Sequence, residues 1–257
     1  MTGLADAATL AERMADAVRP VVMALFRSHI TIEAKADTSP VTAADRDAEA
    51  VMRRMINEAF PDHGIIGEEH GREREDARFV WVLDPIDGTK AFVTGKPLFG
   101  TLIALLDGGR PVVGVIDMPA LKERWVGRAG QPTLFNGTPV ACRDVGRLAD
   151  AWLYATTPDM FRGPDAPAFE SLAGRCRAAV FGADCYAYGL LASGTVDLVC
   201  EASLQVYDFC ALVPVVTGAG GIMTDWHGRP LGLASDGRVL AAGGEAVHAA
   251  AREVLAR

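Results

Sequence analysis

The sequence predicts an α/β (α+β) protein built as a single domain with two packed halves. Helix and strand patterns occur throughout the 257 residues, a length that suits one large domain. In about residues 1–143 helical stretches precede a run of strands, whereas about residues 144–257 alternate strand with helix. No low-complexity tract or flexible linker separates the halves, so we expect them to pack together with the functional site at their seam.

The first half is predicted to hold two helices and a series of strands. Residues 4–28 place apolar side chains on one helical face, with a kink at Pro20. A second helix is expected from Thr42, which resembles a capping box with Asp45, up to Phe60. The charged residues 72–78 predict a solvated connection. Strands are expected over residues 31–34, 64–69, 79–83, 99–106, 111–116, 124–126 and 133–140.

The second half is predicted to alternate strands with helices. Strands are expected over residues 151–156, 196–201, 222–225 and 239–242. Helices are expected over residues 166–177 and 185–192, after Asp208 as far as residue 218, and from about Glu245. The glycines at 218–221 do not follow a strand and open a helix, so we interpret them as a helix-to-strand turn rather than a dinucleotide-binding loop.

The composition limits the compartment and the class of ligand. The net charge is −8, and no run of basic residues offers nucleic acid a footprint, so nucleic acid is not expected as the main ligand. The sequence has no basic, apolar-centred leader and no apolar stretch of membrane-spanning length. Its five cysteines form no Cys-x-x-Cys pair and predict reduced thiols. These features favour a cytoplasmic protein without membrane contact, and any metal site should consist of oxygen ligands.

The stretch Trp81-Val82-Leu83-Asp84-Pro85-Ile86-Asp87-Gly88-Thr89 combines the residue types that bind a metal and a phosphate. An apolar strand ends at Asp84, and Pro85 cannot donate to a ladder, so we expect the chain to turn there. The turn supplies a second carboxylate, Asp87, and then the free amides of Gly88 and Thr89. Carboxylates hold divalent cations and such amides hold phosphate. The alternative is a capped strand end with two solvated acids.

Further acids stand at the ends of predicted elements. The short strand over residues 64–69 ends in Glu68 and Glu69, so one of these two adjacent acids can point toward the site while the other points away. Asp208 stands at the start of an apolar helix, where it could serve either as an N-cap or as a ligand. Asp184 precedes a helix and Glu201 ends a strand, with an N-cap and an arginine ion pair as their structural alternatives.

Taken together, these motifs resemble the inositol monophosphatase superfamily over nearly the whole chain. The matching segments are Gly67-Glu68-Glu69, the stretch from Trp81 to Thr89, Tyr207-Asp208, and Lys35 with Ser39-Pro40-Val41-Thr42-Ala43-Ala44-Asp45. The resemblance implies a layered α-β-α-β-α sandwich. It also implies a Mg²⁺-dependent phosphate monoesterase, with two or three ions, Mn²⁺ as a substitute, and a homodimer.

The resemblance implies a role for each matching residue. Gly88 and Thr89 would bind the phosphate, together with Asp87 and Asp208. Thr89 and Asp45, which we expect to share a hydrogen bond, would polarise the attacking water, with Lys35 nearby and Glu68 contributing to catalysis. The metal ligands would be Glu68, Asp84, the carbonyl of Ile86, Asp87 and Asp208. This set is chemically consistent, because Mg²⁺ prefers hard oxygen ligands and allows in-line displacement without a protein nucleophile.

Other segments are similar to the histidinol-phosphatase branch of this superfamily. They are Lys96-Pro97-Leu98-Phe99-Gly100-Thr101, Gly182-Ala183-Asp184-Cys185-Tyr186-Ala187-Tyr188 and the residues after Tyr207-Asp208, where the wider family begins Trp-Asp. This similarity implies hydrolysis of histidinol phosphate in histidine biosynthesis. Asp184 and Glu201 would then bind the substrate's ammonium end. Inositol 1-phosphate, or another small ester such as adenosine 3′,5′-bisphosphate, is the alternative substrate.

Two alternatives to this family are a phosphatase with a covalent mechanism and a non-enzymatic protein. Asp84-Pro85-Ile86-Asp87-Gly88-Thr89 is similar to the Asp-x-Asp-Gly-Thr motif of haloacid dehalogenase-type phosphatases, which form an aspartyl-phosphate. Here two residues separate the acids, so an extended segment would not point both the same way. A non-enzymatic acidic metal-binding or regulatory protein would require a degenerate site, yet every expected ligand is present.

Overall fold

The computed structural model describes residues 3–28, 33–34, 40–41 and 43–256. The larger of its sheets has eight strands. This sheet has the order β10-β9-β8-β7-β6-β5-β3-β4, and its only parallel pair is β3 with β5 among these described strands. Its members are β3 (Gly64–Gly67), β4 (Gly71–Glu73), β5 (Phe79–Asp87), β6 (Gly100–Asp107), β7 (Arg110–Met118), β8 (Glu123–Arg128), β9 (Leu134–Phe135) and β10 (Thr138–Pro139). A separate antiparallel pair joins β1 (Glu33–Ala34) to β2 (Pro40–Val41).

The second sheet has five strands in the order β12-β11-β13-β15-β14. Strands β11 (Trp152–Ala155), β12 (Ala178–Phe181) and β13 (Leu198–Glu201) run parallel, and β15 (Val239–Ala242) and β13 pair in antiparallel fashion. Strand β14 (Ile222–Thr224) is the far edge. Parallel strands β11 and β13 therefore end on the same side of this sheet.

Eight α-helices are described, and all except α3 belong to the three helical layers. They are α1 (Leu4–Leu25), α2 (Ala43–Ala59), α3 (Thr89–Val93), α4 (Asp165–Ala173), α5 (Tyr186–Ala192), α6 (Val206–Phe209), α7 (Leu212–Gly218) and α8 (Glu245–Leu255). Short 3-10 turns occur at Leu148–Asp150 and Pro158–Met160. No helix in the described part of the chain combines the length and the apolar character needed to cross a membrane.

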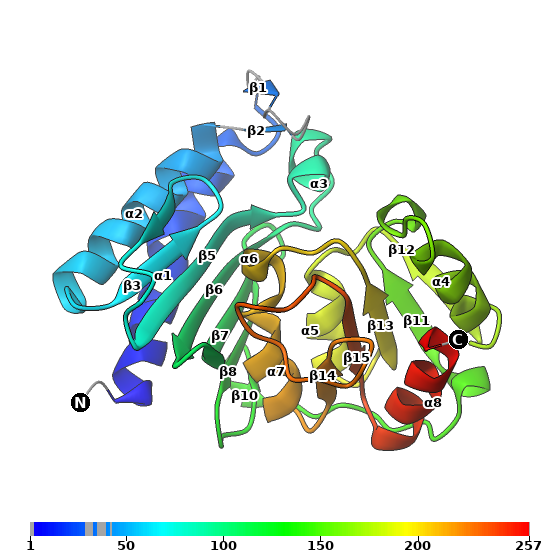
Figure 1. Ribbon diagram of the computed structural model, residues 1–257. Coiled ribbons are helices and arrows are strands. Elements are labelled where there is room, and N and C mark those ends of the chain that lie inside the picture. The colour runs from blue at the N-terminus through cyan, green and yellow to red at the C-terminus, as the bar shows by residue number, and fades with distance from the viewer. Residues whose placement is uncertain (1–2, 29–32, 35–39, 42, 257) are drawn as a thin grey trace.

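The elements stack as an α-β-α-β-α sandwich, which confirms the predicted fold (Figure 1). Helices α1 and α2 cover one face of the large sheet, and α5, α6 and α7 lie between the two sheets. Helices α4 and α8 cover the outer face of the small sheet. Three hydrophobic cores correspond to these contacts: α1 and α2 on the large sheet, the α5–α7 layer between the sheets, and α4 and α8 on the small sheet.

A pair of glycines lets helix α7 lie against the large sheet. Gly114 of β7 and Gly127 of β8 face each other across the ladder. A Cβ at Gly127 would stand 2.3 Å from the carbonyl carbon of Pro214, and one at Gly114 would stand 2.0 Å from the carbonyl oxygen of Ala211. Only glycine leaves space for the α7 backbone at these positions. Because α6 directly precedes α7, this contact also sets the height of α6 above the sheet.

The structure corrects the prediction that the chain turns at Asp84-Pro85. Strand β5 continues to Asp87, with a register shift against β6 between Asp84 and Asp87. Strand β3 has already ended beside Leu83, so Pro85 faces no ladder partner on that side and its missing N–H costs no bond. Its carbonyl oxygen accepts a hydrogen bond from Thr101 Oγ1 at 2.8 Å.

Several predicted boundaries also change. Residues 71–73 form an edge strand rather than part of a connection, and β12 was not predicted. The helix expected after Asp208 is two short helices, α6 and α7, with Asp208 inside the first. Helix α1 ends at Leu25 and contains Pro20. The predicted division at about residue 143 stays a prediction, although the large sheet ends at Pro139 and the small one begins at Trp152.

Candidate active site

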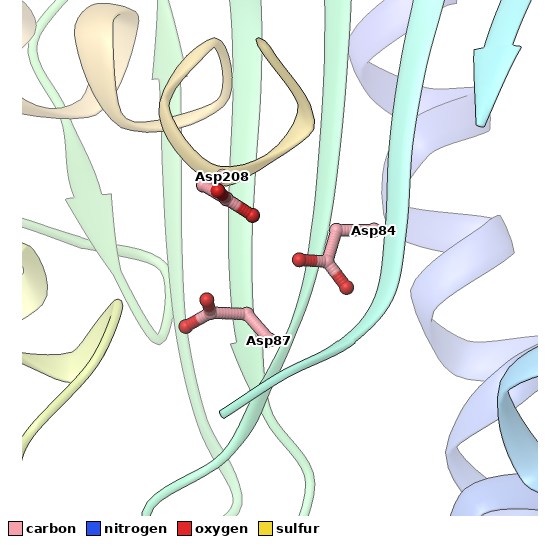
Figure 2. Close-up of side chains that lie close together, drawn as sticks. All are labelled: Asp84, Asp87 and Asp208. Atoms are coloured by element: carbon pink, nitrogen blue, oxygen red, sulfur yellow. The ribbon is translucent and has the colours of Figure 1, made fainter. Parts of the chain in front are cut away.

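Asp84, Asp87 and Asp208 converge at the end of strand β5 (Figure 2). Each offers one carboxylate oxygen, and these oxygens lie within 4.8 Å of one another. In a regular strand, residues three apart point to opposite faces. Here Asp84 pairs with Leu102 and Asp87 with Gly100, so β5 contains one more residue than β6 over this interval. This bulge turns both acids toward the same point.

Asp208 reaches the cluster from helix α6 and is held by its own helix. Its Oδ2 accepts a hydrogen bond from the backbone N–H of Gln205 at 2.7 Å, which closes a capping box with Gln205 as the N-cap. Asp208 is therefore the third helical residue rather than the N-cap that was the structural alternative. The capping bond fixes the direction of the carboxylate.

The cluster is a region of crowded negative charge. Asp84 is 1% exposed, and its Oδ1 has no hydrogen-bond partner among the described residues. Burial, and then the charges of Glu68, Asp87, Asp208 and Asp45, raise the pKa of Asp84 well above its usual value. Burial and the charges of Asp184 and Asp208 raise the pKa of Asp87 in the same way.

The arrangement fits a divalent cation. An unpartnered buried carboxylate oxygen is costly unless a positive charge or a donor reaches it. All three side chains offer carboxylate oxygen, the ligand that hard cations such as Mg²⁺, Mn²⁺ and Ca²⁺ prefer. The acids therefore form a group that could hold a metal.

Glu68 and Asp45 stand around this group rather than in it. Glu68 is half-buried in the turn after β3, and its backbone N–H donates to the carbonyl of Leu83 at 3.2 Å. Asp45, in the first turn of α2, is buried. The charges of both carboxylates raise the pKa of Asp84, so both lie close to it. Lys35 lies outside the described residues, as does Thr42 of the predicted capping box.

Gly88 and Thr89 form the turn into helix α3. Gly88 has a φ of +80°, the left-handed conformation that glycine adopts without strain. The hydroxyl of Thr89 donates to the carbonyl oxygen of Ile86 at 3.1 Å. Between Thr89 and Asp45, both described, the expected hydrogen bond is absent, because the Thr89 hydroxyl uses the nearby carbonyl instead.

Asp184 lies beside the Gly88 turn. A Cβ added to Gly88 would stand 3.3 Å from Asp184 Cγ. Burial raises the pKa of Asp184 to about 6, although the charges of Lys96 and Lys90 oppose that rise. Asp184 has a φ of +49° and is not the N-cap of α5, a position that Cys185 occupies. The N-cap alternative for Asp184 is therefore wrong.

Glu201 is buried at the end of β13, with three hydrogen bonds to its carboxylate. Oε1 accepts from the backbone N–H of Thr156 at 2.9 Å and from its hydroxyl at 2.5 Å. Oε2 accepts from the hydroxyl of Tyr188 at 2.8 Å. These partners take the place of the arginine ion pair that was its structural alternative. Burial raises the pKa of Glu201 to about 7, and the charge of Asp184 adds to that rise.

Three groups that orient these acids were not predicted from the sequence. They are Thr156 and Tyr188, which hold Glu201, and the backbone N–H of Cys185, which donates to Asp87. One of them had a usable signal. Thr156 and Glu201 both close predicted strands, and parallel strands that pair end at the same edge.

The three-acid cluster lies beside a glycine-threonine turn in an α-β-α-β-α sandwich, an arrangement that could hold a cation next to a phosphate group. The model of the inositol monophosphatase family matches residues 4–256, and the chain belongs to this family. It is therefore a phosphatase of the inositol monophosphatase family.

Individual relatives agree with this assignment. The chain is 47% identical to the bifunctional phosphatase IMPL2, chloroplastic, of Arabidopsis thaliana over 96% of this chain and 74% of that protein. It is 35% identical to the histidinol-phosphatase of Streptomyces coelicolor over 88% of each chain. Among solved structures, an inositol monophosphatase from Zymomonas mobilis is 46% identical and superimposes over the full length of both chains with a TM-score of 0.92.

Proposed function

We propose that this phosphatase hydrolyses histidinol phosphate to histidinol and phosphate in histidine biosynthesis, with Mg²⁺ as its metal and Mn²⁺ as a substitute. The observation that supports this substrate most is a pair of further acids, Asp184 and Glu201, next to the three-acid cluster. Histidinol phosphate carries a phosphate at one end and an ammonium at the other. Similarity to histidinol-phosphatases from Chlorobaculum parvum, Streptomyces coelicolor and Mycobacterium tuberculosis supports the same assignment.

The proposed metal ligands are the side chains of Glu68, Asp84, Asp87 and Asp208 and the carbonyl oxygen of Ile86. The unpartnered Oδ1 of Asp84 and the crowded charge around it support this set. When bound, Mg²⁺ would neutralise the phosphate charge and lower the pKa of a water molecule.

The residues of the turn have separate proposed tasks at the phosphate. The backbone amides of Gly88 and Thr89 bind the phosphate oxygens and set its orientation for in-line attack. The Thr89 hydroxyl donates a hydrogen bond to the carbonyl of Ile86, so its oxygen can accept a hydrogen bond from the attacking water. Asp45 accepts a hydrogen bond from the other O–H of that water, and Lys35 stays a predicted neighbour of the site.

Asp184 and Glu201 are proposed to bind the ammonium end. Charge-assisted hydrogen bonds of this kind contribute about 1.5–3 kcal/mol each. Thr156 and Tyr188 hold Glu201 in one orientation, which lowers the entropy cost of binding.

Inositol 1-phosphate is the second candidate substrate. The 46% identity to the Zymomonas mobilis inositol monophosphatase favours it, as does the bifunctional relative in Arabidopsis thaliana. Because inositol carries no cation, it would gain little from Asp184 and Glu201. Adenosine 3′,5′-bisphosphate and other small monoesters follow as further alternatives.

Phosphate release from a panel of these esters, with Mg²⁺ or EDTA, tests the proposal. We expect the highest kcat/KM for histidinol phosphate and no turnover in EDTA. A preference for inositol 1-phosphate would contradict the proposed substrate and leave the phosphatase family intact. The predicted cytoplasmic homodimer is checked separately by sedimentation of the purified chain and by fractionation of cells.

A further inference from the structure

The turn between β3 and β4, which carries Glu68, has three consecutive backbone amides held by neighbours. The N–H of Glu68 donates to the carbonyl of Leu83, the residue before Asp84. The next two amides, of Glu69 and His70, donate to the two oxygens of one carboxylate, Glu49, at 2.7 and 3.1 Å. Glu49 therefore holds the backbone on one side of Glu68, and strand β5 holds it on the other.

Glu49 is fully buried, which is unusual for a glutamate. It lies on α2 one turn after Asp45, so both acids lie on the same side of that helix. Arg53, one turn further along, donates from Nε to Glu49 Oε1 at 2.7 Å and also bonds the carbonyl of Gly71. The two amides and the guanidinium satisfy the buried charge.

The sequence also leaves space for this carboxylate. A Cβ at Gly67 would stand 2.0 Å from Glu49 Oε1, so only glycine at the end of β3 lets Glu49 approach the turn. A buried carboxylate, a glycine that leaves space for it and the guanidinium of Arg53 all lie at one short turn. The partners of the Glu49 carboxylate are the amides of the two residues that follow Glu68 and the guanidinium of Arg53.

We infer that Glu49 is a positioning residue for the metal site: it fixes the turn so that the Glu68 carboxylate faces Asp84. The inference rests on the proposed function, in which Glu68 is a metal ligand. Helix α2 then serves the site twice, through Asp45 at its first turn and Glu49 at its second. Loss of a group that orients a metal ligand commonly lowers metal affinity about 10–100-fold.

Mn²⁺ titrated by calorimetry into the purified full chain tests this role. Glu49→Gln keeps the size of the side chain and one acceptor oxygen but removes the charge and turns an amide toward the two N–H groups. We expect it to weaken Mn²⁺ binding about 10–100-fold, with most of kcat recovered at saturating metal. Asp47→Asn is the matched control, because Asp47 is an exposed carboxylate on the same helix, and it should leave the affinity unchanged.

A double variant separates positioning from a general loss of stability. If Glu49 acts through Glu68, then Glu49→Gln with Glu68→Gln should bind Mn²⁺ no more weakly than Glu68→Gln alone. Unchanged affinity in Glu49→Gln, or fully multiplicative losses in the double variant, would overturn the inference. Absence of Mn²⁺ binding in the wild type would instead overturn the proposed function. If Glu49→Gln does not fold, Glu49→Asp, which keeps the charge but shortens the reach, gives the same readout.

Discussion

Asp87 Oδ2 accepts a hydrogen bond from the backbone N–H of Cys185 at 2.7 Å, which ties the end of β5 to the start of α5. The residue before Cys185 is Asp184, so this contact joins the three-acid cluster to the acid proposed to bind ammonium. Cys185 lies between β12 of the small sheet and helix α5. The bond therefore links strand β5 of the large sheet to the segment that carries Asp184.

Asp84→Asn should remove activity yet stabilise the metal-free protein. The substitution eliminates a buried charge that four other acids surround. The burial of Asp84, and then the repulsion from those acids, raise the pKa of Asp84. Each kcal/mol gained should raise Tm by about 2–4 °C for a chain of this size. Thermal unfolding in EDTA at pH 8 checks this, with Asp47→Asn as an exposed control. A lower Tm for Asp84→Asn would mean that the cluster is not under electrostatic strain.

The stability of the metal-free protein should fall as pH rises. Asp84 and Asp87 have folded pKa values above the unfolded value of 3.8, so the native state binds more protons than the unfolded state. Their contribution is present below pH 3.8 and is lost as pH rises through the raised values. Mg²⁺ should cancel this loss and release protons on binding. Calorimetry in two buffers of different ionisation enthalpy measures that release; none at pH 6 would contradict the raised pKa values.

Thr89→Ala and Asp45→Asn should each lower kcat by about 10²–10⁴-fold, the usual contribution of acid-base assistance. Both are proposed to accept hydrogen bonds from the same water, so the double variant should be scarcely worse than either single one. Thr89→Ser, which retains the hydroxyl that bonds Ile86, is the control and should keep most of the activity. Steady-state kinetics at saturating Mg²⁺ measures all four, and independent multiplicative losses would assign the residues to separate tasks.

Asp184→Asn and Glu201→Gln should raise KM for histidinol phosphate by roughly 10–100-fold each, since a charge-assisted bond is lost. KM for a small phosphate ester without a cationic group should change much less. Because Asp184 has a pKa of about 6 and Glu201 of about 7, Asp184 ionises as pH rises through 6 and Glu201 as pH rises through 7. The ratio of KM values, the ester without a cation over histidinol phosphate, should therefore rise between pH 6 and 8 in the wild type. Equal losses on both esters would contradict an ammonium site.

Gly127→Ala should destabilise the protein and weaken metal binding together. The new methyl group would overlap the backbone of Pro214 and push α7, and with it the α6 helix that carries Asp208. Overpacking of this kind costs about 1–3 kcal/mol, or about 2–12 °C in Tm. Gly174→Ala, at a helical φ of −66°, is the control. A normal Mn²⁺ affinity in Gly127→Ala would separate α7 packing from the position of Asp208.

The order of the elements and the identity of the acids were predictable because both depend on local pattern. Apolar periodicity predicts α1, α2 and the central strands; Asp84 and Asp87 follow a predicted apolar strand, and Asp208 precedes a predicted apolar helix. The edge strands β4 and β12 were not predicted, because β4 is charged and β12 has a pairing partner on one side only. An edge strand is defined by its partner more than by its own composition.

The geometry of the site was not predictable, because it depends on register and long-range contacts. The shift that turns Asp84 and Asp87 to one side exists only in the pairing of β5 with β6. Glu49 looks like an ordinary helical glutamate until Glu69, His70 and Arg53 are placed around it. The expected hydrogen bond between Thr89 and Asp45 was wrong, because the Thr89 hydroxyl donates to the carbonyl of Ile86, three residues away.

Asp84, Asp87 and Asp208 are proposed to hold a divalent cation together. Anomalous diffraction from a crystal grown with Mn²⁺ tests this metal site, because the signal locates the ion independently of activity. We predict a peak within ligand distance of all three carboxylates, with Asp84 Oδ1 among the ligands. A crystal in which Mn²⁺ occupies other positions, or in which these three carboxylates carry no peak at saturating Mn²⁺, would contradict the proposed metal site.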